Sequence, residues 1–225
     1  MQLQYQLSSS PDYTILKLQI PVGQTILADA GSMVAMDPHV ELQTQFRGGM
    51  TRFLTGESLF LSRYTAVSRI GQIELAPPTF ANIIHIPMSS QGPAVFIQSA
   101  AFLASTANVK VESKYQGIMK SFFSGGNLFL GKVTGDGDLW LSVFGNLVSI
   151  DVQSDYVIDS DHVVAFEEGL DYEVKLVSSL KRSFFSGEGF VCRFRGQGRV
   201  WIQSRKVGAF VGWAEKYRIT RSSNQ

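Results

Sequence analysis

The chain contains a short phrase three times, and this repetition restricts the folds that it can adopt. Each copy has a bulky apolar pair, a hydroxyl residue, a glycine and, two residues later, an apolar run. The copies span Phe53–Leu61, Phe122–Leu130 and Phe184–Cys192, with glycines at Gly56, Gly125 and Gly187. Glycine is favoured where the backbone takes a positive φ or turns sharply into a strand. We therefore interpret these glycines as turns of a repeated unit, in which Leu54, Phe123 and Phe185 fill equivalent half-buried positions.

A second phrase lies upstream of each copy and closes on an alanine. The three upstream phrases span Thr25–Ala35, Ala94–Ala104 and Tyr156–Ala165. From the closing alanine to the glycine of the next copy the distances are 21, 21 and 22 residues. Three spacings this similar are not expected by chance, so we predict three tandem units. Their predicted bounds are 1–80, 81–144 and 145–225, the last with a packed apolar tail at Val207–Tyr217.

Strand patterns begin and end each unit. The opening patterns are Ile15–Ile20, Ile83–Ile86 and Leu147–Val152, and the closing patterns are Gln72–Leu75, Asp138–Leu141 and Arg199–Ile202. Several alternate apolar and polar residues, which is typical of half-buried strands, and Trp140 and Trp201 are expected at equivalent half-buried positions. Gly-x-Gly precedes the last two closing patterns and predicts tight hairpin turns. No long segment has helical periodicity, so we predict an all-β fold.

Composition excludes several classes of protein. Lys and Arg total 20 against 19 Asp and Glu, so no overall charge favours nucleic acid or a membrane surface. The single cysteine, Cys192, excludes an internal disulfide. Residues 1–10 lack the basic and apolar regions of a secretory signal, and the apolar window Ala94–Val109 is too short to span a bilayer. We expect a cytoplasmic protein without a membrane span.

Three phrases carry a resemblance to a known family. They are Ala28–Met33 (ADAGSM), Gly56–Leu61 (GESLFL) and Gly187–Phe190 (GEGF). Over essentially its whole length, the chain resembles the prokaryotic family related to the mitochondrial biogenesis protein of the "altered inheritance of mitochondria" screen, formerly a domain of unknown function. The resemblance implies three tandem β-sandwich lobes, each a short double-stranded β-helix similar to a subunit of the trp RNA-binding attenuation protein (TRAP). It also implies that three chains close a homotrimeric ring of nine lobes, and the family has no established enzymatic activity.

Residues with catalytic or metal-binding chemistry are few and scattered. The histidines, none with the spacing of metal ligands, are His39, His85 and His162. Cys192 lies in an apolar strand, at the position held by Leu61 and Leu130 in the other units, which indicates a small core residue. The Ser-Gly turns lack the lysine of a P-loop, and Asp136–Asp138 lacks the closing glutamate of a calcium loop. We expect no catalytic residue, no metal site and no cofactor.

Charge is segregated in the last unit. Eight acidic residues and no basic one lie from Asp151 to Glu173, and eleven basic residues against two acidic ones follow from Val174 to Gln225. Side chains that alternate along the predicted hairpin share a face, which makes candidate anion-binding residues of Arg193, Arg195 and Arg199. Two functional interpretations are open, namely a head-to-tail contact between subunits or the binding of RNA or phospholipid. A solvated surface explains the charges as well.

The leading hypothesis for function is a non-enzymatic, ring-forming scaffold or binding module whose ligand is unknown. The alternative is a nucleic-acid or anionic-ligand binder that uses the basic hairpin of the last unit. Three lobes leave an open sheet edge at each end of the chain, and exposed edges favour pairing with another strand. We therefore expect a homotrimer in which the last lobe of one chain contacts the first lobe of the next.

Overall fold

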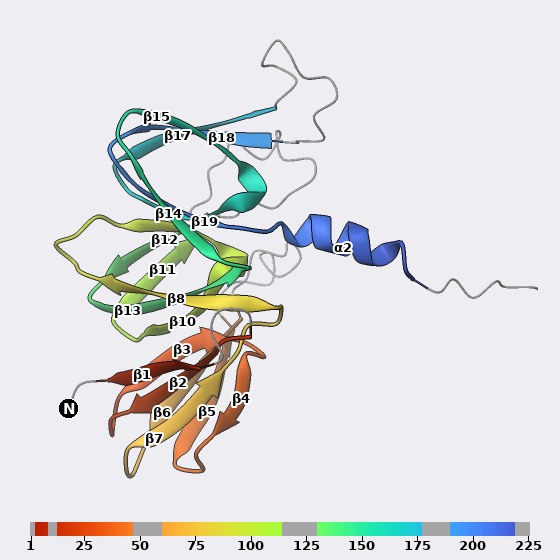
Figure 1. Ribbon diagram of the computed structural model, residues 1–225. Coiled ribbons are helices and arrows are strands. Elements are labelled where there is room, and N and C mark those ends of the chain that lie inside the picture. Colours follow the sequence, from red (N-terminus) through yellow and green to blue (C-terminus); the bar gives the residue numbers. More distant parts are fainter. Residues whose placement is uncertain (1–2, 9–12, 47–59, 114–129, 177–189, 219–225) are drawn as a thin grey trace, which may run out of the picture.

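Strands dominate the part of the chain that the structure describes. The computed structural model describes residues 3–8, 13–46, 60–113, 130–176 and 190–218. Figure 1 shows sheets stacked from the N-terminal strands upward to the C-terminal ones, with helix α2 (Val207–Glu215) projecting to one side. The predicted all-β fold class is confirmed. The repeated-phrase residues that lie outside the described residues are Leu54, Gly56, Phe123, Gly125, Phe185 and Gly187.

After an N-terminal strand, β1 (Gln4–Ser8), the described strands fall into three successive groups of six. Group 1 contains β2 (Ile15–Ile20), β3 (Thr25–Asp29), β4 (Met33–Met36), β5 (Val40–Phe46), β6 (Phe60–Ala66) and β7 (Gly71–Leu75). Group 2 contains β8 (Ala81–Met88), β9 (Val95–Gln98), β10 (Phe102–Thr106), β11 (Val109–Ser113), β12 (Leu130–Gly135) and β13 (Gly137–Phe144). Group 3 contains β14 (Leu147–Val152), β15 (Asp155–Asp159), β16 (Val163–Glu167), β17 (Leu170–Leu176), β18 (Phe190–Gly196) and β19 (Gly198–Gln203).

The three groups have the same strand order in space. In each group the first, sixth and third strands pair in one sheet, and the second, fifth and fourth strands pair in another. Adjacent groups are joined because β10 pairs with β3 and β16 pairs with β9, all antiparallel. These joints make two continuous six-stranded sheets, and the sheets β1-β2-β7-β4 and β15-β18-β17 end the stack. The order supports the predicted organisation in three units, whose bounds stay a prediction.

A β-bulge stands at the same place in each group. The third strand shifts its register immediately before an alanine, and these alanines are Ala35, Ala104 and Ala165. They are the residues that close the three upstream phrases. The bulge therefore gives the regular spacing of those phrases a structural reason, because each group must shift register at the same point to hold its third strand against the sixth.

Cys192 occupies a position one residue away from the predicted one. It pairs with Ile158 in β15, as Ser62 pairs with Ala28 and Gly131 pairs with Ile97 in the other groups. These three small, buried residues are each 27 positions beyond the bulge alanine of their group. The predicted match of Cys192 with Leu61 and Leu130 was therefore wrong, because the third phrase glycine stands one residue later than the other two.

The two Gly-x-Gly segments are corners between sheets. β12 pairs with β9 and β11 whereas β13 pairs with β8 and β10, so the chain changes sheet between Gly135 and Gly137. β18 and β19 change sheet in the same way across Gly196 and Gly198. The predicted hairpins at these places are wrong. Positive φ angles of 109° at Gly135 and 110° at Gly196 let the backbone turn this corner without placing a Cβ in the way.

Each joint between groups is filled by a tryptophan from the later group. Trp140 of β13 is fully buried in the core cluster of group 1, which includes Ile26 and Tyr64. Trp201 of β19 is buried in the core cluster of group 2, which includes Ile97. Each tryptophan lies opposite the bulge alanine of its own group. The two residues are equivalent in register as predicted, but they are buried rather than half-buried because they complete a neighbouring core.

The C-terminal tail forms a helix that the sequence analysis did not predict. It was expected to pack on the last unit, yet α2 has no buried residue. It meets the body of the molecule through Phe210, whose ring centroid lies 6.0 Å from that of Phe80 and 5.7 Å from that of Phe144. Among the described residues, no helix has the length and apolar character needed to cross a membrane.

Replacing Gly135 by alanine is expected to lower the free energy of unfolding by about 2 kcal/mol or more. The new Cβ would stand 2.3 Å from the backbone oxygen of Asn108, and the φ of 109° disfavours an L side chain. Gly212→Ala in α2 is the matched control, because a Cβ there meets no heavy atom within 4 Å and alanine favours helix. Urea unfolding followed by circular dichroism measures both variants, and equal effects would contradict a strained corner at Gly135.

The thiol of Cys192 is expected to be unreactive in the folded protein. Burial raises its pKa to about 12, and the carboxylate of Asp159 adds to the rise, so little thiolate is present at pH 8. Because the folded pKa is above the ordinary value, this group favours the fold below pH 9 and loses that contribution as pH rises toward 12. Ellman's reagent should react with one thiol after guanidinium is added and with none before; rapid reaction in native buffer would contradict the buried position.

Candidate functional site

Two strands differ from their counterparts because one of their edges is open. Within the described residues β4 pairs with β7, whereas its counterparts β10 and β16 pair also with the preceding group. Likewise β15 pairs with β18, whereas β3 and β9 pair also with the following group. Figure 1 shows β4 and β15 at opposite ends of the stack. Among the described strands, β5, β11 and β17 are edges in all three groups, and β8 and β14 are edges where β1 covers β2 in group 1. The edges that are open at the ends of the stack but paired at the internal joints are therefore those of β4 and β15.

β4 exposes apolar side chains at positions that its counterparts bury. Val34 is 53% exposed, whereas Leu103 and Val164 at the same position are each 1% exposed. The other three residues of the strand, also exposed, are Met33, Ala35 and Met36. A strand that presents apolar side chains together with unpaired backbone groups is a template for pairing with another strand.

β15 presents a matching edge at the other end of the stack. Val157 is 51% exposed and Tyr156 is nearly half exposed, whereas Leu27, at the position of Val157 in group 1, is 7% exposed. Ile158 is buried, because it points into the core of group 3. Each end of the stack thus carries half of a joint that is complete between groups 1 and 2 and between groups 2 and 3.

Glu74 stands at the open end in the position that the internal joints give to tryptophan. It lies opposite Ala35 in β7, as Trp140 and Trp201 lie opposite the other bulge alanines. Its carboxylate is 3.0 Å from the ammonium of Lys17. A carboxylate at this position keeps the open end of the first group more polar than the two internal joints.

The candidate anion-binding arginines are ion-paired and belong to two different sheets. The pairs are Arg193 with Asp155, Arg195 with Glu173 and Arg199 with Asp151, and the N–O separations in the last two are 3.6 and 2.9 Å. The hydrogen bond from Arg193 lowers the pKa of Asp155 below its usual range. Arg199 is on β19, and Arg193 and Arg195 are on β18, so the three side chains do not share one face of a hairpin. The acidic and basic stretches neutralise each other within group 3, which does not favour a polyanion site.

A hydrogen-bonded chain of Tyr5, His85 and Asp138 holds β1 against group 2. Nε2 of His85 is 2.7 Å from Oδ1 of Asp138, and Nδ1 is 3.1 Å from Oη of Tyr5. The rings of Tyr5 and His85 cover the buried Trp140, with centroid distances of 5.7 and 5.6 Å. Sequence reasoning missed this cluster because His85 is separated from its partners by 80 and 53 residues and only the strand register brings them together.

The other two histidines have structural partners. Nδ1 of His39 is 3.2 Å from Oγ of Ser68, and Nδ1 of His162 is 2.6 Å from the backbone oxygen of Gln203. In the described ranges, no three His, Cys, Asp or Glu side chains gather in a way that could hold a metal ion. The three histidines therefore stay separate, each in its own hydrogen bond.

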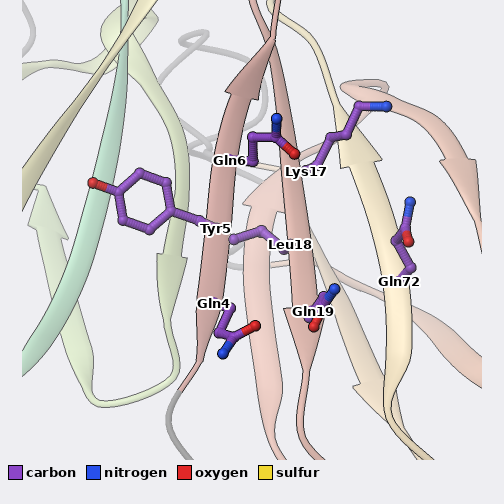
Figure 2. Close-up of a pocket in the computed structure, with 7 residues that line it drawn as sticks. All are labelled: Gln4, Tyr5, Gln6, Lys17, Leu18, Gln19 and Gln72. Carbon is purple, nitrogen blue, oxygen red and sulfur yellow. The ribbon is translucent and has the colours of Figure 1, made fainter.

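A shallow, open hollow of about 400 Å³ lies on the outer face of the first sheet. Its lining residues are Gln4, Tyr5, Gln6, Lys17, Leu18, Gln19 and Gln72. Figure 2 shows the glutamine and lysine side chains on one face of the strands, with the ring of Tyr5 directed away from them. The strand register aligns Gln4, Gln19 and Gln72 in one row across β1, β2 and β7. Such amide groups both donate and accept hydrogen bonds, which favours neutral polar ligands over anions.

Comparisons with known proteins agree with this architecture. Residues 5–205 match the family described as "Mitochondrial biogenesis AIM24". An uncharacterized protein of Streptococcus pyogenes serotype M6 is 28% identical over 98% of this chain and 93% of its own length. An X-ray structure of a protein from Streptococcus pyogenes, 26% identical, matches with a TM-score of 0.78 and covers 96% of this chain and 100% of that one. The resemblance seen in the sequence is confirmed, and the chain belongs to the mitochondrial biogenesis AIM24 family.

Proposed function

We propose that the chain is a non-enzymatic scaffold or binding module that assembles into a ring, with its three strand groups acting as TRAP-like lobes. Chains join head to tail, and β4 of one chain pairs with β15 of the next. The observation that carries this proposal is the exposure of all four residues of β4, whose counterparts are paired at both internal joints. A heterologous contact closes a ring when its rotation divides a full turn. Three chains, as the family resemblance implies, make a ring of nine lobes.

The internal joints specify the register of the proposed contact. The opposed pairs at these joints are Ala104 with Ala28 and Ala165 with Ile97. In both cases a bulge alanine lies opposite the residue seven positions before the bulge alanine of the preceding group. The same rule sets Ala35 opposite Ile158 of the next chain and Met36 opposite Val157.

The exposed side chains make this contact favourable. Val34, Met36 and Val157 would each lose water-exposed apolar surface, at a gain on the order of 1 kcal/mol per side chain. The strand ladder would also satisfy the open backbone groups of both edges. Including the lobe surfaces on either side, we expect more than about 1,000 Å² to be buried in total, as in most biological contacts.

Cysteines placed at Met36 and Val157 are expected to form a disulfide between chains. Directly opposed residues of antiparallel strands have Cβ atoms close enough for a disulfide. After mild oxidation of the Met36→Cys/Val157→Cys variant, non-reducing electrophoresis should show one, two and three linked chains and nothing larger. Met36→Cys/Val148→Cys is the matched control, because Val148 is comparably exposed on β14. Linkage beyond three chains would contradict the closed ring, and the absence of linkage would contradict the β4–β15 contact.

A charge at Val157 is expected to break the assembly. Val157→Lys buries an unpaired ammonium at the proposed contact, so light scattering at micromolar concentration should fall from three chain masses to one. Val148→Lys should leave the mass unchanged, because β14 is an edge like its counterpart β8. Adding Met36→Asp opposite the new lysine should restore part of the assembly. A wild-type mass of one chain would refute the ring.

A further inference from the structure

An exposed row of aromatic side chains runs from the body of the molecule along α2. We call this row the aromatic patch, and its residues are Tyr13, Phe80, Phe210, Trp213 and Tyr217. Consecutive rings in this order are in contact, with centroid distances of 5.6, 6.0, 6.0 and 5.2 Å. Each of the five side chains is more than one-third exposed, and Trp213 is 56% exposed. A continuous apolar surface of this size marks an interaction site on a protein.

The helix geometry explains why the aromatic patch is continuous. Phe210 and Trp213 are three residues apart, so their side chains fall on one face of α2, and Tyr217 follows in the turn after the helix with its ring against that of Trp213. Val207 lies one turn earlier on the same face and is also exposed. Figure 1 shows that α2 points away from the sheets, which leaves this face accessible to a large, flat partner.

α2 is too weak a helix to be stable by itself. It has nine residues, two of which are glycines, and its N-terminal residue Lys206 makes no side-chain capping hydrogen bond. An isolated helix of this length is marginal in water, and each glycine costs about 1 kcal/mol relative to alanine. A surface that covered its apolar face would therefore stabilise α2.

The charges around the helix select the kind of surface. Basic residues flank it at both ends, and they are Arg205, Lys206, Lys216 and Arg218. The one acidic residue in this segment is Glu215, whose carboxylate is 3.9 Å from the guanidinium of Arg218. Lys206 is bound to Asp159, which leaves the two ends of the segment with an excess of positive charge. A complementary partner is negatively charged.

We propose that the aromatic patch docks on the surface of an anionic phospholipid bilayer. The rings of Phe210, Trp213 and Tyr217 would enter the boundary between headgroups and acyl chains, where aromatic side chains are favoured. Arg205 and Lys216 would contact the lipid phosphates. This inference is independent of the proposed ring, because every residue that it uses belongs to one chain.

A second copy of the chain fits the aromatic patch less well. A two-fold contact between antiparallel α2 helices would place Arg205 and Lys206 of one copy beside Lys216 and Arg218 of the other. Like charges brought together in a contact oppose association. A bilayer with anionic headgroups instead supplies opposite charge at both ends of the helix.

Trp213 makes the proposal directly measurable without a change to the sequence. The other two tryptophans, Trp140 and Trp201, are buried, so a change of fluorescence on adding vesicles reports on Trp213. Vesicles of phosphatidylcholine and phosphatidylglycerol in equal amounts should shift the emission to shorter wavelength and sediment with the protein. Vesicles of phosphatidylcholine alone should bind at least about tenfold more weakly, because the basic residues gain nothing there.

Two double variants test the aromatic patch and the flanking basic residues separately. Phe210→Ser/Tyr217→Ser keeps the fluorophore Trp213 and should weaken binding about tenfold or more, because it removes apolar surface that would enter the bilayer. Arg205→Glu/Lys216→Glu should weaken binding to the anionic vesicles about tenfold or more and leave circular dichroism and oligomeric mass unchanged. The control is Lys110→Glu, an exposed change of the same sign on β11. Equal binding of the wild-type protein to both vesicle types would overturn the proposal, and so would binding that neither double variant weakens. A wild-type protein that binds no vesicles, together with a loss of oligomeric mass in Phe210→Ser/Tyr217→Ser, would also overturn it, because the aromatic patch would then be a contact between chains.

Discussion

The antiparallel ladder between the third strand of one group and the second strand of the group before it is the interaction on which the structure depends. It turns six short strands per group into continuous sheets, and it requires a register shift before each bulge alanine. That shift brings Trp140 and Trp201 to the boundary, where each ring fills the core of the neighbouring group. Backbone pairing and core packing at a joint are thus one cooperative feature, and neither forms well without the other.

The open end of group 1 has a charged residue where the internal joints have a tryptophan. Inside the chain the two halves of a joint are covalently linked, so a large apolar side chain at Trp140 or Trp201 is always covered. At the open end the equivalent residue is Glu74, paired with Lys17, and it meets water whenever the chain is alone. This difference explains why Glu74 stands where the internal joints have a tryptophan, because a tryptophan there would add a large apolar surface to an already exposed edge.

Much of the fold could be predicted from local pattern and spacing. The all-β class followed from strand alternation, and the regular spacing of Ala35, Ala104 and Ala165 reflects a bulge that every group needs. The corners at Gly135 and Gly196 could not be predicted, because a Gly-x-Gly turn suits both a hairpin and a change of sheet, and distant partners decide between them.

The candidate site could also be predicted only in part. An open sheet edge at each end was expected from the number of repeated units, and the charge stretches of the last unit are visible in the sequence. That Arg193 and Arg199 meet carboxylates of the same unit depends on the register of strands nearly forty or more residues apart, which no local pattern contains. Helix α2 was missed because Val207–Glu215 is short, and its two glycines hide the helical period.

Any ring of these chains that closes by rotation about one axis would have two unlike sides, and α2 would project in the same way from every chain. Rotation about a single axis leaves the height of every atom along that axis unchanged, so all copies of the helix emerge at one level. Such an assembly has a front and a back, and two of them stacked in the same direction differ from two stacked face to face. Such a ring would be polar, and it could bind a flat surface through one particular face.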